Sequence, residues 1–137
     1  MALPTLPAGR QADQAGAPAG AVEWVAFQEN KIPELIAAGK PVFVDVTAEW
    51  CLTCKVNEKW VLQDPEVLSE FKRRGVVMMR ADWTRQDASV GRYLAEHGRA
   101  GIPFYALYYP HRDPVVLSEF LTKKKVLREL RAWDALQ

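Results

Sequence analysis

The segment Phe43–Lys55 reads FVDVTAEWCLTCK. The run Val42–Thr47 is rich in β-branched residues and does not alternate between apolar and polar positions, which is typical of a strand buried on both faces of a parallel sheet. Its single charge is Asp45. Helix-forming residues follow from Cys51 to about Leu62. The sequence therefore predicts a buried strand, a short turn and a helix.

The two cysteines of the chain, Cys51 and Cys54, stand where this strand gives way to the helix. The free N–H groups and the positive dipole end of a helix N-terminus lower the pKa of a thiol placed there, which favours a thiolate at Cys51. A spacing of three residues brings the second sulfur within bonding reach. We therefore expect Cys51 to attack a disulfide and Cys54 to resolve the resulting mixed disulfide.

Other uses of a C-x-x-C pair can be compared with the rest of the sequence. A structural zinc site needs about four ligands, and the remaining candidates, His97 and His111, are far from the cysteines in the sequence. Haem attachment requires histidine where Lys55 stands. A copper(I) site that uses both thiolates stays open, because soft metals bind paired cysteines. Inert cysteines also stay open.

Length and composition limit the remaining classes of function. The 137 residues correspond to about one domain, and the formal net charge of +1 gives no field that would attract nucleic acid or an anionic membrane. No apolar run approaches the roughly 20 residues that a membrane helix needs. Twelve of the residues 1–20 are Ala, Pro or Gly, which predicts a flexible linker to something upstream and a folded domain at 21–137.

Outside the central stretch, strand and helix patterns alternate along the chain. The order expected is β-α-β-α-β-α-β-β-α, an α/β arrangement that ends in a hairpin and a helix. A stripe of apolar residues on the last helix should cover one face of the sheet. The remaining strands are expected at 22–27, 76–81, 104–109 and 115–117, with a turn at 110–114, and the remaining helices at 30–38, 65–74, 88–97 and from about 122.

The stretch Phe43–Lys55 resembles the active-site strand and turn of thioredoxins, with an Asp six residues before the first Cys and Trp50 directly before it. Gly101-Ile102-Pro103 stands where thioredoxins carry their cis-proline loop. Across Val22–Trp133 the sequence resembles the C-terminal periplasmic domain of the DsbD-type thiol:disulfide interchange proteins, including their ScsB-like relatives. The pattern Cys-x-x-Cys-Lys-x-x-Glu, which ends at Glu58, is similar to that family's. Phe104 departs from the threonine that many thioredoxins carry after the proline.

This resemblance implies a thioredoxin fold, with a central mixed β-sheet flanked by helices, and protein-disulfide reductase activity. It implies that Asp45 and Glu58 lie near the thiols, that the Ile102–Pro103 bond is cis, and that no organic cofactor or metal is needed. In such proteins this domain takes electrons from a membrane-embedded portion and passes them to periplasmic disulfide partners. The resemblance thus implies a periplasmic domain of an inner-membrane protein. We expect the domain itself to be monomeric, and the net charge of +1 predicts no nucleic-acid partner.

The supporting residues also allow simpler interpretations. Asp45 could be a charge at a strand edge, but a carboxylate in an apolar run is costly unless it is paired or functional, so we expect it to handle protons. Glu58 is either a solvated helix residue or a group that tunes the thiols from the same helix face. Trp50 is expected either to pack over the site or to contact the substrate. Ile102 and Pro103 are expected to contact the substrate. His97 and His111 are expected to be structural or exposed.

The residues between the cysteines bear on the direction of electron flow. Leu52 and Thr53 supply no cation that would stabilise a Cys51 thiolate, so the sequence favours a reductant over an oxidase. A free-standing or tethered thioredoxin-like reductant, such as one serving cytochrome maturation, is the alternative within this class. The copper(I)-binding module is the alternative outside it.

Overall fold

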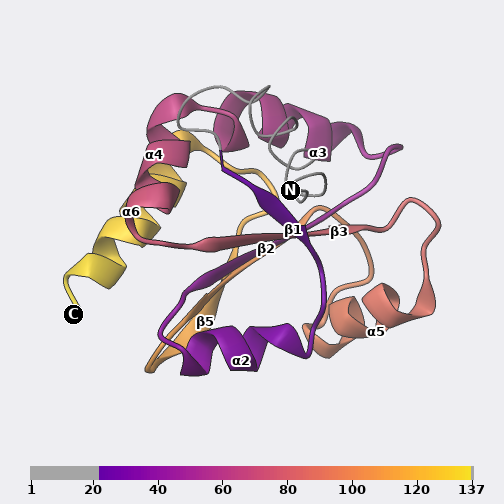
Figure 1. Ribbon diagram of the computed structural model, residues 1–137. Helices are drawn as coiled ribbons and strands as arrows, with labels where there is room; N and C mark the ends of the chain where they lie inside the picture. Colours follow the sequence, from indigo (N-terminus) through magenta and orange to yellow (C-terminus); the bar gives the residue numbers. More distant parts are fainter. Residues whose placement is uncertain (1–21, 137) are drawn as a thin grey trace, which may run out of the picture.

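The computed structural model describes residues 22–136, and strand β2 (Val42–Thr47), with all six residues buried, lies at the centre of its sheet (Figure 1). The five strands have the order β1-β3-β2-β4-β5. Strands β1 (Trp24–Ala26) and β3 (Val77–Asp82) run parallel to β2, and β4 (Phe104–Tyr109) and β5 (Arg112–Leu117) form an antiparallel hairpin beside it. The mixed sheet and its buried central strand are as predicted.

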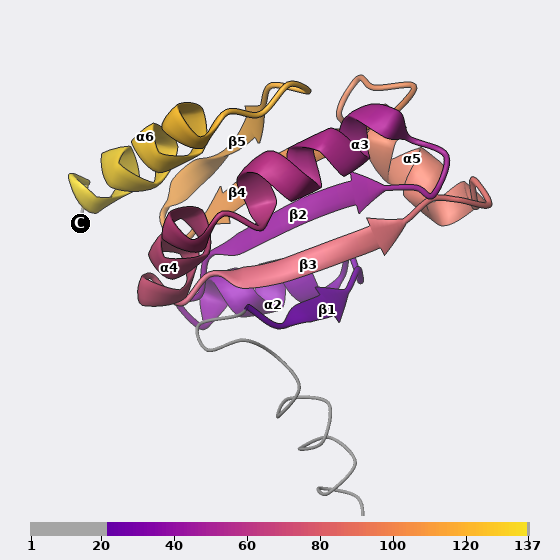
Figure 2. The ribbon, with the colours of Figure 1, turned by 90° about the horizontal axis from the view of Figure 1, so that it is seen from above.

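Helices cover both faces of this sheet (Figure 1). The second view, from above, shows α2 behind the strands and α3 in front of them (Figure 2). One layer holds α3 (Leu52–Asn57), its π-helical continuation η1 (Glu58–Leu62), α4 (Pro65–Arg73) and α6 (Lys123–Asp134). The other layer holds α2 (Lys31–Ala37) and α5 (Ala88–Glu96). This three-layer arrangement is the predicted α/β fold.

Alternation along β2 divides the core between the two layers. Phe43 belongs to a cluster with buried residues of η1, α4 and α6, whereas Val42, Val44 and Val46 belong to a cluster with α2 and α5. Since side chains two positions apart share a face of a strand, Asp45 points to the side of Phe43, into the layer of α3. The buried residues of α6 are those of the predicted apolar stripe, Val126, Leu127, Leu130 and Trp133.

One edge of the sheet collects the loops that matter for function. Strands β2 and β3 end there side by side at Thr47 and Asp82. Strand β4 begins there with Phe104, and β5 ends there at Leu117. The segments that meet at this edge are therefore 48–51, 83–87, 98–103 and 118–122.

The hairpin turn predicted at 110–114 is wrong in its extent. Strand β5 begins at Arg112, which pairs with Tyr109, so that the turn consists of Pro110 and His111, the latter with φ 63°. The second proline, Pro114, lies inside β5, where a bulge interrupts the register. A proline is tolerated there because β5 is an edge strand and needs no donor on its outer side.

The predicted linker at 1–20 and the predicted domain boundary at residue 21 lie outside the described residues. Within residues 22–136, no helix has the length and apolar character needed to cross a membrane.

Candidate active site

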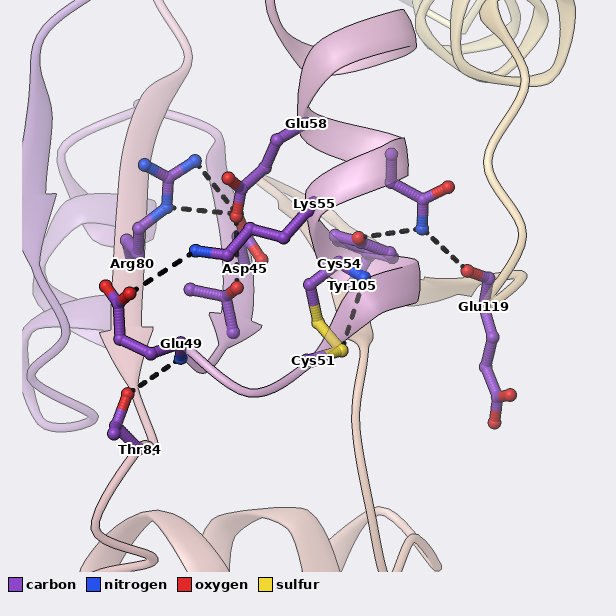
Figure 3. The surroundings of a disulfide bond; sticks show 12 residues. Asp45, Glu49, Cys51, Cys54, Lys55, Glu58, Arg80, Thr84, Tyr105 and Glu119 are labelled. Atoms are coloured by element: carbon purple, nitrogen blue, oxygen red, sulfur yellow. Dashed lines mark hydrogen bonds and ion pairs between the residues drawn. A yellow bond between two sulfur atoms is a disulfide. The ribbon is translucent and has the colours of Figure 1, made fainter.

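Cys51 and Cys54 are joined by a disulfide at the start of α3, with their Cα atoms 5.3 Å apart (Figure 3). Cys51 is the N-cap residue of this helix, and its Sγ accepts a hydrogen bond from the Cys54 backbone N–H at 3.2 Å. The exposed fraction is 6% for Cys51 and 0% for Cys54. Both residues are buried, and of the two only Cys51 retains any exposed surface.

The side chain of Asp45 is fully buried between β2 and α3, and it is paired with Arg80. Asp45 and Arg80 are neighbours in register on the parallel strands β2 and β3. Nε and Nη2 of Arg80 both lie 3.1 Å from Oδ2 of Asp45. The guanidinium also stacks on the ring of Trp24, at 3.7 Å from its centroid. Asp45 is thus an internal ion-pair partner rather than a charge at a strand edge.

Burial raises the pKa of Asp45 to about 6, and the charge of Glu58 adds to this rise, while Arg80 opposes it. Oδ1 of Asp45 is buried and has no hydrogen-bond partner among the described residues. A carboxyl group in this state exchanges a proton near neutral pH and has a free oxygen with which to do so.

Glu58, the first residue of η1, is connected to strand β2 through Thr47. Oγ1 of Thr47 donates a hydrogen bond to Oε2 of Glu58 at 3.0 Å. Thr47 follows Asp45 by two residues and so shares its face of the strand. The π-helical segment η1 begins at Glu58, four residues after Cys54. The structure therefore brings both carboxylates together beneath the helix that carries the cysteines (Figure 3).

The turn before Cys51 is fastened to the loop that follows β3. The backbone N–H of Glu49 donates to Oγ1 of Thr84 at 2.9 Å, and Nε1 of Trp50 donates to the carbonyl oxygen of Thr84 at 3.0 Å. The Trp50 ring also packs against Trp83, with 6.3 Å between centroids, yet it stays about half exposed. Trp50 combines a packing role with a surface that a partner can reach.

The segment before β4 reaches the cysteines through Ile102. Ile102 packs against the small buried cluster of Ala48, Cys51 and Cys54, and the Ile102–Pro103 peptide bond is cis, as the resemblance to thioredoxins implies. The predicted site residues that the structure brings together around α3 are therefore Asp45, Cys51, Cys54, Glu58 and Ile102.

The two histidines, His97 and His111, lie outside the site around the cysteines. His97 contacts Tyr93 and Tyr108 near the end of α5, and His111 forms the β4–β5 turn. Within residues 22–136, no group of three or more His, Cys, Asp or Glu side chains is placed to hold a metal ion.

The sequence analysis missed the contacts that Arg80 and Thr47 make with the two carboxylates. A signal for Arg80 existed, since it is the only charge in the predicted strand at 76–81, and a buried carboxylate on the neighbouring strand requires a cation. No sequence signal pointed to Thr47, because its bond to Glu58 depends on how α3 lies over β2.

Residues 23–110 match the model of a thioredoxin-like family. The chain belongs to this thioredoxin-like family. Its β2–α3 junction, with the C-x-x-C disulfide at the N-terminus of the helix, is the part of the family fold that carries the redox pair.

Similar curated proteins are thiol:disulfide interchange proteins. The chain is 29% identical over 102 residues to DsbD of Klebsiella pneumoniae, and 32% identical over 117 residues to DsbD 1 of Pseudomonas aeruginosa. These alignments cover 72% and 80% of this chain but only 17% and 20% of the relatives. The chain thus spans at most about a fifth of the length of these relatives.

Solved structures show the same fold. The reduced C-terminal domain of Neisseria meningitidis DsbD has a TM-score of 0.62 and 20% identity, covering 79% of this chain and 98% of that domain. A thioredoxin from Thermus thermophilus has a TM-score of 0.63 and 21% identity, covering 81% of this chain and 85% of its own.

Proposed function

We propose that this thioredoxin-like domain reduces disulfides in partner proteins by dithiol–disulfide exchange. The observation that carries the proposal is the Cys51–Cys54 disulfide at the N-terminus of α3, in which Cys51 retains a small exposed surface and Cys54 has none. A reversible disulfide with one accessible sulfur is the arrangement that exchange chemistry requires, because one thiolate must meet the partner and the other must stay behind to resolve it.

The exchange takes place in two displacements. In the reduced domain, the Cys51 thiolate attacks one sulfur of the partner's disulfide, forms a mixed disulfide and releases the partner's first thiolate. The Cys54 thiolate then attacks the Cys51 sulfur and releases the partner's second thiolate. The domain loses two electrons and becomes the Cys51–Cys54 disulfide, while the partner gains two electrons and, with two protons, becomes a dithiol.

Asp45 is proposed to accept the proton that Cys54 loses before it attacks. Its pKa of about 6 leaves it mostly ionised at neutral pH, and its free Oδ1 supplies the lone pair. Glu58 supports this role because its charge helps to raise the pKa of Asp45. Trp50, Ile102 and Pro103 are proposed to contact the partner, since Trp50 is exposed beside Cys51 and Ile102 packs on the disulfide.

The direction of electron flow is proposed to be toward the partner. Leu52 and Thr53 place no cation between the cysteines, and two carboxylates lie beneath the helix, so the Cys51 thiolate receives less stabilisation than in a strong oxidase. The similarity to DsbD proteins supports a periplasmic location within a longer inner-membrane protein. A membrane-embedded domain would be the electron donor, and periplasmic redox proteins would be the acceptors.

The test is to mix the fully reduced domain with oxidised insulin and follow both proteins by mass spectrometry after acid quench and alkylation. One insulin disulfide should be opened for each domain that becomes oxidised at Cys51 and Cys54. A variant with both cysteines changed to serine controls for adventitious reductant. Persistence of intact insulin beside reduced domain would refute the proposal.

A further inference from the structure

A single buried amide, that of Asn57, holds both peptide groups of Phe120. Nδ2 of Asn57 donates to the carbonyl oxygen of Glu119 at 2.8 Å, and Oδ1 accepts from the backbone N–H of Leu121 at 3.3 Å. These groups belong to the peptide bonds before and after Phe120. The second hydrogen of Nδ2 is donated to the Tyr105 hydroxyl at 2.9 Å. The amide thus ties the segment 118–121 to both α3 and β4.

Asn57 is well suited to this task because it lies one helical turn after Cys54, at the last position of α3. Only 4% of it is exposed. Burying an amide is costly unless its donors and acceptor are satisfied, and here the partners all come from the sheet and the loop rather than from the helix itself. The side chain therefore couples the position of the cysteine helix to that of the loop.

The segment 118–121 lies at the same edge of the sheet as the disulfide. It leaves β5 directly after Leu117, which pairs with Tyr105, two residues after Pro103. The carboxylate of Glu119 also contacts Nη1 of Arg99 at 3.4 Å, in the segment that precedes Ile102. In Figure 3, Glu119 lies on the opposite side of the α3 N-terminus from Asp45 and Arg80. The loop is therefore tethered next to the exchange site.

While its backbone is held, the side chain of Phe120 is left in solvent. The residue is 66% exposed, and its N–H donates to Oγ of Ser118 at 3.1 Å. Leu121, the next residue, is buried and anchors the segment in the core. An exposed aromatic ring on an ordered backbone loses little entropy when a partner covers it, so it is preorganised for binding.

We propose that Asn57 is a positioning residue that presents Phe120 to the polypeptide carrying the disulfide attacked by Cys51. Phe120 then selects partners with an apolar side chain beside the reacting cysteine. The occupant is fixed by continuity with the exchange site, because any polypeptide whose disulfide reaches Cys51 must lie along this edge of the sheet. This inference rests on the proposed function and adds to it a preference among substrates.

The probe is a pair of disulfide-bridged peptides that differ only in the residue next to the attacked cysteine, leucine in one and serine in the other. The readout is kcat/KM for reduction of each peptide by the full chain, regenerated with dithiothreitol. The unsubstituted domain should prefer the leucine peptide by about tenfold, and Phe120→Ala should remove that preference with little change for the serine peptide. The loss should fall mainly on KM.

Trp60→Ala is the matched control. Trp60 is exposed to the same degree, at 68%, but it lies in η1, nine residues after Cys51 and beyond the end of α3. This variant should keep the preference. A preference lost equally in Trp60→Ala would show general surface stickiness and would overturn the proposal.

Asn57→Leu tests the positioning role, since leucine has a similar volume but holds neither peptide group. It should reduce the preference as Phe120→Ala does, and the double variant should lose no more than either single variant, because both changes remove the same contact. Asn57→Ser, whose side chain is too short to span both groups, serves if the leucine variant does not fold. Additive losses would overturn the role of Asn57.

The outcomes separate this inference from the proposed function. A domain that reduces neither peptide refutes the function itself. A domain that reduces both peptides equally, or whose preference survives Phe120→Ala, keeps the function and overturns the inference.

Discussion

Arg80 contacts one carboxylate oxygen of Asp45 and leaves the other free. Nε and Nη2 of Arg80 each lie 3.1 Å from Oδ2 of Asp45, whereas the buried Oδ1 has no hydrogen-bond partner in residues 22–136. A cation placed in this way offsets part of the burial cost of the carboxylate without saturating it. The Asp45 side chain lies on the face of β2 that packs against the layer of α3 and η1, which carry Cys54 and Glu58. The ion pair therefore leaves Asp45 able to take up and release a proton.

Asp45→Asn should stabilise the oxidised protein above pH 6 by up to roughly 3 kcal/mol. Because the pKa of Asp45 rises from 3.8 to about 6 on folding, the folded protein binds this proton more tightly than the unfolded chain does. The free energy of unfolding therefore falls as the pH rises from about 4 to 6. Above about pH 6 the loss of stability caused by Asp45 is complete. Urea unfolding at pH 4 and pH 7.5 measures the effect, and a gain that does not depend on pH would contradict it.

Arg80→Met should raise the pKa of Asp45 further, because the guanidinium lowers it by its charge and its hydrogen bond. The carboxyl carbon of Asp45, followed by NMR across pH, should titrate above its position in the unsubstituted protein. Arg92→Met, at an exposed position on α5, is the control and should leave the titration in place. An unshifted titration in Arg80→Met would show that the ion pair has no electrostatic effect on Asp45.

Cys51→Ser should abolish the reduction of protein disulfides, whereas Cys54→Ser should accumulate as a mixed disulfide with its substrate. The difference follows from access, since Cys51 retains some exposure and Cys54 has none. Gel mobility without reductant, with insulin as substrate, distinguishes the two variants. A mixed disulfide in Cys51→Ser but not in Cys54→Ser would reverse the assigned roles.

Replacing Asp45 by Asn and Glu58 by Gln should lower the pH at which Cys51 reaches half of its maximal alkylation rate. Negative charge beneath α3 disfavours the Cys51 thiolate, and both replacements remove such charge. The comparison is made in the Cys54→Ser background, so that only one thiol reacts. An unchanged or higher midpoint in the double variant would leave both carboxylates with a structural role only.

The elements that the sequence predicted well are those whose signals are local. The β-branched run of β2 and the apolar stripe of α6 are set by residue type and period, and both are confirmed. The helices expected at 65–74 and 88–97 are present as α4 and α5, and Asp64 and Asp87 cap their N-termini by accepting backbone hydrogen bonds. The hairpin turn was predicted too long because Pro114, a turn signal in sequence, lies on an edge strand.

The contacts that complete the site join residues that are far apart in the sequence. Arg80 is 35 residues from Asp45, and the partners of Asn57 lie 48 to 64 residues away. The pairing of Asp45 with Arg80 depends on strand register, and the contacts of Asn57 depend on how β4 and the loop after β5 lie beside α3. Asn57 in the sequence is an ordinary polar helix residue. Its importance follows from burial, which no local pattern reveals.

The reduction potential of the Cys51–Cys54 pair shows whether this domain is a reductant or an oxidant. The domain is equilibrated in dithiothreitol buffers of known potential, and the dithiol fraction is read by alkylation and mass spectrometry. We expect a reversible two-electron transition whose midpoint lies nearer the about −270 mV of thioredoxin than the about −120 mV of a strong disulfide oxidase. A midpoint near −120 mV, or a disulfide that these buffers do not reduce reversibly, would contradict it.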